Sequence, residues 1–135
     1  MKSFYNEVNW LKSLDEIEGA TTRTSAYTFD PNGNILTLTL PNAAVTTKAF
    51  DELNRVTQIT NAAATYDQTY DLAGNVLEIV ESYPSNPQLD RTVANDYDKI
   101  YRLKQELDTP AAAGSSPKQT DFTSPPDCEA MMSRS

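Results

Sequence analysis

The sequence predicts an all-β fold of tandem antiparallel β-hairpins over residues 27–108, and two observations predict it. In four copies, an aromatic residue followed by Asp precedes a short turn-like sequence and then an apolar run. Asp30, Asp51, Asp71 and Asp98 are separated by 21, 20 and 27 residues. A period of this size is typical of repeats that bury an apolar face only by stacking on their neighbours.

The copy at residues 29–35 explains what each repeat forms. Its turn sequence, Asp30–Gly33, has Asp first, Pro second and Gly fourth. These are the residues that favour a type I turn followed by a left-handed position. Residues 27–29 and 35–40 flank the turn and are rich in aromatic and β-branched side chains with period-two alternation. The segment is therefore predicted to be a hairpin, with Phe29 next to Ile35.

The other copies follow this pattern with substitutions at the left-handed position. The third copy keeps Gly, the second has Asn54, which tolerates positive φ, and the fourth has Tyr101, which is strained there. The residues predicted to form the turns are Asp30, Gly33, Asp51, Asn54, Asp71, Gly74 and Asp98. One face of the hairpins is expected to supply a shared core of Leu36, Leu38, Leu40, Ile59, Leu77 and Ile79.

The two ends of the chain are less regular than residues 27–108. In residues 1–26, Tyr5–Leu11 fits a degenerate fifth copy, but a short helix over about 7–18 ending at Gly19 fits equally well. Residues 109–135 are rich in Pro, Ser and Ala and are predicted to form a flexible tail.

The copies resemble the YD repeat of the RHS family, in which an aromatic residue and Asp precede Gly, then Arg or Asn, and an apolar strand. Residues 27–35 and 70–76 carry the resemblance best, and Arg55 and Arg102 stand where the family often has Arg. The resemblance covers about residues 27–107, although two copies lack the Gly.

This resemblance implies a structural and non-catalytic function. RHS proteins form a long β-strip that spirals into a hollow shell, which encloses a C-terminal toxin in bacterial relatives and belongs to cell-surface adhesion proteins in animal relatives. Four copies are too few to close a shell, so the chain resembles a fragment of a longer shell protein. Its expected partners are further repeats of that parent, or other copies that pair with its open sheet edges. An isolated fragment is therefore expected to be marginally stable or self-associating.

Composition narrows the function further. The formal charge of −8 disfavours binding to nucleic acid or anionic lipid, and no apolar stretch is long enough for a membrane span. The first residues lack the apolar segment of a secretory signal, whereas members of the resembled family are typically exported or located at the cell surface. The compartment of this chain is therefore left open.

The chain also lacks the side chains that most catalytic and metal sites require. It has no His and a single Cys, Cys128, so Ser-His-Asp and Cys-His pairs and zinc sites are not predicted. The repeated Asp residues are interpreted as turn formers instead of catalytic carboxylates. We therefore expect no enzyme activity, no cofactor and no bound metal.

Tyr27 and Tyr70 suggest an alternative function. Aromatic faces along a β-strip can stack on sugars, as in a carbohydrate-binding or adhesion module at a cell surface. The competing interpretation is cross-strand packing, which aromatic side chains supply in any sheet.

Overall fold

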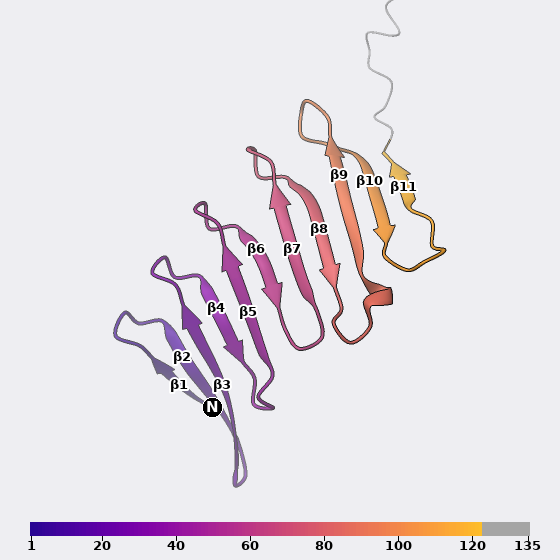
Figure 1. Cartoon of the computed structure of the whole chain (residues 1–135). Coiled ribbons are helices and arrows are strands. Elements are labelled where there is room, and N and C mark those ends of the chain that lie inside the picture. Colours follow the sequence, from indigo (N-terminus) through magenta and orange to yellow (C-terminus); the bar gives the residue numbers. More distant parts are fainter. Residues whose placement is uncertain (123–135) are drawn as a thin grey trace, which may run out of the picture.

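A computed structural model describes residues 1–122, which form a single open antiparallel sheet of eleven strands (Figure 1). Each strand pairs with the strands before and after it in the chain, so every connection is a hairpin. The predicted all-β fold is confirmed. The strands are β1 (Lys2–Tyr5), β2 (Leu11–Glu18), β3 (Thr21–Phe29), β4 (Ile35–Thr39), β5 (Val45–Phe50), β6 (Val56–Thr60), β7 (Thr65–Tyr70), β8 (Val76–Ser82), β9 (Arg91–Tyr97), β10 (Leu103–Pro110) and β11 (Lys118–Asp121), with a 3-10 helix, η1 (Pro87–Leu89), before β9.

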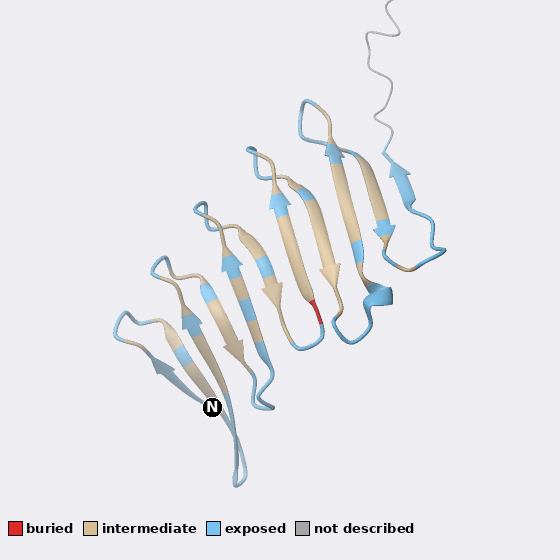
Figure 2. Cartoon of the chain, viewed as in Figure 1, coloured by how far each residue is buried: buried red, intermediate tan, exposed pale blue. Residues whose placement is uncertain are grey.

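The sheet is a single layer, and this determines where its stability comes from. Ala64 is the only fully buried residue in 1–122, and most strand residues are half-buried (Figure 2). The expected shared core is therefore wrong. The pairing places Leu38, Ile59 and Ile79 on one face, but no second layer covers them within the described residues. Cross-strand contacts within the layer must supply the stability.

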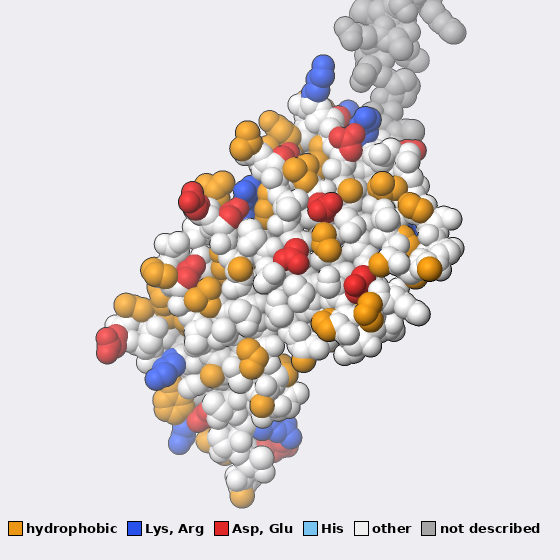
Figure 3. Space-filling view, in the orientation of Figure 1, with side chains coloured by type: hydrophobic (Ala, Val, Ile, Leu, Met, Phe, Trp, Pro, Cys, Tyr) orange, Lys and Arg blue, Asp and Glu red, His pale blue; other side chains and the backbone are white. Residues whose placement is uncertain are grey.

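The opposite face carries small hydroxyl side chains. Thr28 pairs with Thr37, and the register continues this row across six neighbouring strands. Two Thr–Thr pairs are hydrogen-bonded through their Oγ1 atoms, Thr28 with Thr37 at 2.7 Å and Thr65 with Thr60 at 3.4 Å. The row consists of Thr28, Thr37, Thr47, Thr60, Thr65 and Ser82. On the face shown in Figure 3, hydrophobic side chains are scattered among polar ones and form no single patch.

Residues 1–26 extend the sheet, so the helix alternative for residues 7–18 is wrong. Residues 6–10 form a turn between β1 and β2, and Leu11–Glu18 is a strand. The cause is local, because the Asn6 side chain accepts hydrogen bonds from the backbone N–H groups of Val8 and Trp10. These bonds close the same turn that Asp closes in the other copies.

The C-terminal segment also differs from its prediction. Residues 109 and 110 belong to β10, and Lys118–Asp121 forms β11, where a flexible tail was expected to begin at 109. The physical reason is the free edge of β10, whose backbone groups pair with β11. Gln105 Nε2 also donates to Asp121 Oδ1 at 2.9 Å. The rest of the predicted tail, residues 123–135 with Cys128, lies outside the described residues.

Within residues 1–122, no helix combines the length and the apolar character that a membrane span needs.

Candidate functional site: a ladder of turns along one edge

Five turns of the same construction lie along one edge of the sheet, where β1, β3, β5, β7 and β9 end (Figure 1). We number them from the N-terminus. The first turn is residues 6–10, the second 30–34, the third 51–55, the fourth 71–75 and the fifth 98–102. The predicted turn residues Asp30, Gly33, Asp51, Asn54, Asp71, Gly74 and Asp98 all lie in this row.

An Asn or Asp side chain organises each turn. The backbone N–H of this first residue donates to the carbonyl of the fifth residue at 2.9 to 3.0 Å. Its Oδ1 accepts from the backbone N–H groups of the third and fifth residues at 2.8 to 3.1 Å. One side-chain oxygen thus satisfies two donors that the turn would otherwise leave unpaired.

The fourth residue of every turn has a left-handed backbone. The φ angles are 61° at Asn9, 90° at Gly33, 61° at Asn54, 94° at Gly74 and 65° at Tyr101. Gly adopts this conformation without strain and Asn tolerates it, but it is costly for a bulky residue such as Tyr. The fifth turn keeps the common geometry despite Tyr101.

A β-bulge follows each turn and fixes how the next strand returns. The aromatic residue before the turn pairs with an apolar residue after it, as Phe29 pairs with Ile35, and the following residue is skipped in the register. The same shift occurs beside Tyr5, Phe50, Tyr70 and Tyr97. The predicted contact between Phe29 and Ile35 is therefore present as a direct register pair. A bulge at the same place in each unit gives all five hairpins the same local twist.

The second carboxylate oxygen is used in two ways, which alternate along the ladder. Oδ2 accepts from the side chain of Asn34 in the second turn and of Asn75 in the fourth, at 2.8 and 2.7 Å. In the third and fifth turns it accepts from Nε of Arg55 and Arg102, at 2.6 and 2.7 Å. In the first turn the organising residue is not a carboxylate, because Asn6 takes the place of Asp.

These hydrogen bonds lower the pKa of all four turn carboxyls below the usual value of 3.8. For Asp30 and Asp71 the largest cause is the hydrogen bond from the Asn side chain. For Asp51 and Asp98 it is the backbone N–H of the Arg four residues later. The carboxylates are therefore held in their charged form as hydrogen-bond acceptors.

Side chains also connect each turn to the next one. The ring of Trp10, at the end of the first turn, lies against Phe29 with centroids 5.3 Å apart. The same indole lies beside Gly33, where an added Cβ would be 3.3 Å from Trp10 Cζ2. The second and third turns are joined at Asn54, whose Oδ1 accepts from the side chains of Asn32 at 3.0 Å and Asn34 at 2.8 Å.

Arg55 and Tyr70 form the connection between the third and fourth turns. The guanidinium of Arg55 lies over the Tyr70 ring, 4.5 Å from its centroid, and Nη1 donates to the Asp71 carbonyl at 3.0 Å. In return, the Tyr70 hydroxyl donates to the carbonyl of Val56 at 2.6 Å. Tyr97 repeats the last contact in the fifth turn, where its hydroxyl donates to the Val76 carbonyl at 2.9 Å.

Comparison with known proteins relates part of this row of turns to a repeat family. The RHS Repeat family model matches residues 29–66, which include the second and third turns. Residues 29–66 are therefore assigned to the RHS-repeat family. No curated protein matches the chain significantly. The RHS repeat is a structural repeat, and the ladder shows how consecutive RHS repeats are joined here.

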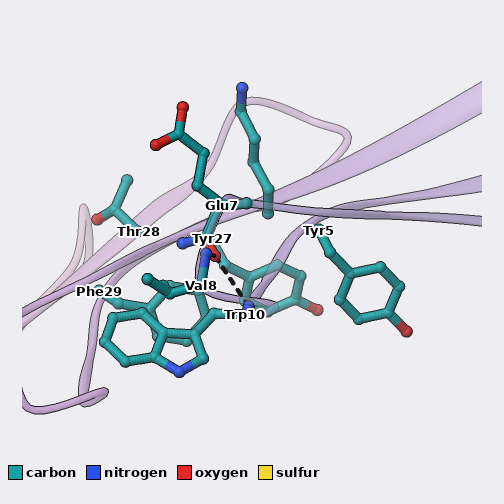
Figure 4. A pocket seen from close by; sticks show the side chains of 9 residues that line it. Tyr5, Glu7, Val8, Trp10, Tyr27, Thr28 and Phe29 are labelled. Atoms are coloured by element: carbon teal, nitrogen blue, oxygen red, sulfur yellow. Dashed lines mark hydrogen bonds between the residues drawn. The ribbon is translucent and has the colours of Figure 1, made fainter.

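Tyr27 and Tyr70, the predicted ligand-stacking residues, lie in different surroundings. The Tyr70 ring lies under the Arg55 guanidinium, and its hydroxyl donates to the Val56 carbonyl, as expected for cross-strand packing. Tyr27 lies on β3 and lines an open concavity of about 610 Å³. Figure 4 shows this concavity, with Tyr5 and Trp10 among its lining side chains and the hydrogen bond from Trp10 N to Asn6.

Sequence reasoning missed the residues that connect neighbouring RHS repeats. Arg55 was recognised as a family position, but not as the partner of Tyr70 in the next turn. Trp10 was part of a doubtful copy, and its contact with Gly33 was not foreseen. A usable signal existed, because Trp10, Arg55 and Arg102 all follow the left-handed residue and precede the returning strand.

Proposed function

We propose that this chain is a non-catalytic structural segment of an RHS-repeat shell, which encloses cargo such as a toxin domain. One observation carries the proposal. Eleven strands form a single layer in which only Ala64 is fully buried among residues 1–122. A single-layer sheet of this kind suits the wall of a shell. Its exposed faces and unpaired outer strands need further protein, or enclosed material, to cover them.

The turn ladder supports this function, since neighbouring turns are joined to one another along the row. The joining side chains differ: Trp10 lies against Phe29, Asn34 bonds to Asn54, Arg55 lies over Tyr70, and the Tyr97 hydroxyl donates to the Val76 carbonyl. Turns of the same geometry can thus be joined through different side chains. The carboxylates are committed to turn formation, which supports a structural role over a catalytic one for the repeated Asp residues.

The first experiment measures the behaviour of the isolated chain. Sedimentation velocity and thermal unfolding are recorded over a hundredfold range of concentration. A wall segment with open edges is expected to self-associate, so its sedimentation coefficient and its melting temperature should rise with concentration. A monomer with a sharp and concentration-independent transition would argue against the proposal.

The second experiment addresses the cargo. The coding sequence on both sides of this chain is determined in its source genome. Further RHS repeats, followed by a toxin domain, are the expected result. Flanking sequence without any such repeat would overturn the enclosing role, because the chain would then not be part of a larger shell.

Carbohydrate binding is the second candidate, and the concavity beside Tyr27 favours it. Its lining combines aromatic rings with the polar side chains of Glu7 and Lys12, a composition suited to stacking on a sugar and bonding its hydroxyls. A glycan array tests it with Tyr27→Ala, which should abolish any signal. Tyr101→Ala is the matched control, because that Tyr is 63% exposed and lies in the fifth turn. An array without hits, or a loss with both variants, would reject this function.

A further inference from the structure

The concavity beside Tyr27 carries one acidic and one basic side chain. Glu7 and Lys12 both line it, and both are exposed. Glu7 lies in the first turn, and Lys12 is the residue that the register skips in the bulge after this turn. Within residues 1–122, neither of them takes part in an ion pair. A carboxylate and an ammonium at the same opening are complementary to a ligand that carries both signs of charge.

Aromatic rings lie next to these two charges. Tyr5, Trp10 and Tyr27 line the same concavity (Figure 4), and Tyr5 is 60% exposed. Trp10 is held in place by Phe29, whose ring centroid lies 5.3 Å from its own. The faces of Tyr and Trp rings attract cations, and several such rings around one space form the usual receptor for a quaternary ammonium group. The volume of about 610 Å³ lies in the range of sites for small molecules.

The third and fourth turns show that a ring at this repeat position can hold a cation. Tyr5 and Tyr70 each directly precede the first residue of a turn. The guanidinium of Arg55 lies over the Tyr70 ring, 4.5 Å from its centroid. No cationic side chain of residues 1–122 lies over the Tyr5 ring in this way, so this ring is open to a cation from outside the chain.

We propose that this concavity binds a phosphocholine group, carried by a glycan or by a lipid headgroup. The trimethylammonium end contacts the rings of Tyr5 and Tyr27 beside the Glu7 carboxylate. The phosphate end accepts hydrogen bonds from the Lys12 ammonium, and the net charge of −8 attracts the cationic end of the group. The proposal goes beyond sugar binding at this place, because the phosphocholine group is recognised and not the hydroxyls of a sugar ring.

The fluorescence of Trp10 reports on the concavity, because Trp10 is the only Trp in the chain. Phosphocholine is titrated into the full chain at low protein concentration, and a saturable change is expected. The matched probe is 3,3-dimethylbutyl phosphate, which has the same shape but carbon in place of the charged nitrogen. It should bind at least about fivefold more weakly, since the positive charge supplies the attraction to the rings. Inorganic phosphate alone should bind more weakly than either.

Two pairs of variants test the charged ends of the site. Glu7→Gln and Lys12→Gln should each weaken phosphocholine binding at least about threefold. Glu52→Gln is the control for the first, because Glu52 has the same place in the third turn. Lys104→Gln is the control for the second, because the register skips Lys104 after the fifth turn. Both controls should bind as the unmodified chain does, and circular dichroism shows whether each variant keeps the sheet.

Vesicles of phosphatidylcholine identify the source of the group. Co-sedimentation that free phosphocholine competes away would assign a lipid headgroup. A fluorescence response to free phosphocholine without vesicle binding would assign a group carried by a glycan. Vesicle binding without any response to free phosphocholine would contradict the proposal, because the lipid surface and not the group would then be bound.

The other outcomes separate this proposal from the functions proposed above. No saturable change up to about 10 mM phosphocholine, equal binding of the uncharged analogue, or equal losses in the control variants would each overturn it. A neutral sugar that binds through Tyr27, with no response to phosphocholine, would overturn it and leave sugar binding in place. The wall function does not depend on any of these results.

Discussion

The two edges at which the chain reverses direction differ in regularity. At one edge, five turns share their hydrogen bonds, their left-handed residue and the bulge that follows. At the other, the connections vary from a tight turn at Gly19 to residues 83–90, which include the 3-10 helix η1. The 27-residue spacing between Asp71 and Asp98 includes this longer connection. The turn edge therefore fixes the register of the sheet, and the connection edge absorbs differences in length.

The largest effect that separates the two edges is expected in acid. The folded pKa of Asp30, Asp51, Asp71 and Asp98 lies below 3.8, so the unfolded chain binds more protons at low pH. Their contribution to stability is complete well above pH 3.8 and is lost as the pH falls below that value. Amide spectra recorded between pH 6 and pH 2.5 should show four turns opening together.

The first turn is the internal control for this titration, because Asn6 has no proton to gain. While the sheet persists, the amide of Trp10, which bonds to Asn6 Oδ1, should keep its shift after those of the Asp turns have moved. Simultaneous movement of all five turns would mean that the carboxylates do not control the acid transition.

A substitution at each edge gives the next largest difference. Asp51→Ala removes the acceptor of three hydrogen bonds, from Leu53, Arg55 N and Arg55 Nε. It also frees the Arg that covers Tyr70. Asn61→Ala at the connection edge removes bonds only to the Ala63 and Ala64 amides, worth about 0.5–1 kcal/mol. In thermal melts, Asp51→Ala should lower the melting temperature at least twice as much. Equal losses would remove the distinction between the edges.

Substitutions at the left-handed position of two turns should change the stability in opposite directions. Gly33→Ala adds a Cβ at φ 90° and 3.3 Å from the Trp10 ring, which should cost about 1–2 kcal/mol. Tyr101→Gly relieves the same backbone strain in the fifth turn and should stabilise by about 0.5–1 kcal/mol. Urea unfolding of both variants measures the two signs. Destabilisation by Tyr101→Gly would show that its side chain contributes more than its backbone strain costs.

Tyr70→Phe is a smaller change, and it tests the contact of Tyr70 with the preceding repeat. The substitution keeps the ring under Arg55 and removes the hydroxyl that donates to Val56, so a loss of about 0.5–1.5 kcal/mol is expected. Phe50 in the third repeat shows that the position accepts Phe. Tyr101→Phe, on an exposed ring, should change the urea midpoint by nothing measurable. An unchanged urea midpoint with Tyr70→Phe would show that the hydroxyl contributes nothing and that the contact of Arg55 with the ring alone connects the two repeats.

The sequence predicted the turn edge well and the connection between repeats poorly, for physical reasons. Asp30 and Gly33 act within five residues, so their preferences are local and can be read from the sequence alone. The contact of Arg55 with Tyr70 depends on which strands become neighbours, and the aromatic residue alone suggested a ligand as readily as a packing partner. The lack of a buried core within residues 1–122 could not be predicted either, because alternating Leu and Ile look the same in sequence whether or not a second layer covers them.

The smallest effect is expected from lengthening a connection. Insertion of two residues, Gly and Ser, after Ser85 enlarges the exposed segment between β8 and β9; it interrupts one exposed backbone hydrogen bond, from Asn86 N to the Tyr83 carbonyl, and leaves the five turns of the ladder intact. The entropic cost of a longer loop grows only slowly with its length, so the loss should be below about 0.5 kcal/mol. The same insertion after Asn32 displaces Gly33 from the left-handed position and separates Asp30 from the amide of Asn34. Urea unfolding should therefore distinguish the two insertions clearly, and a similar loss in both would show that the connection edge also determines the register.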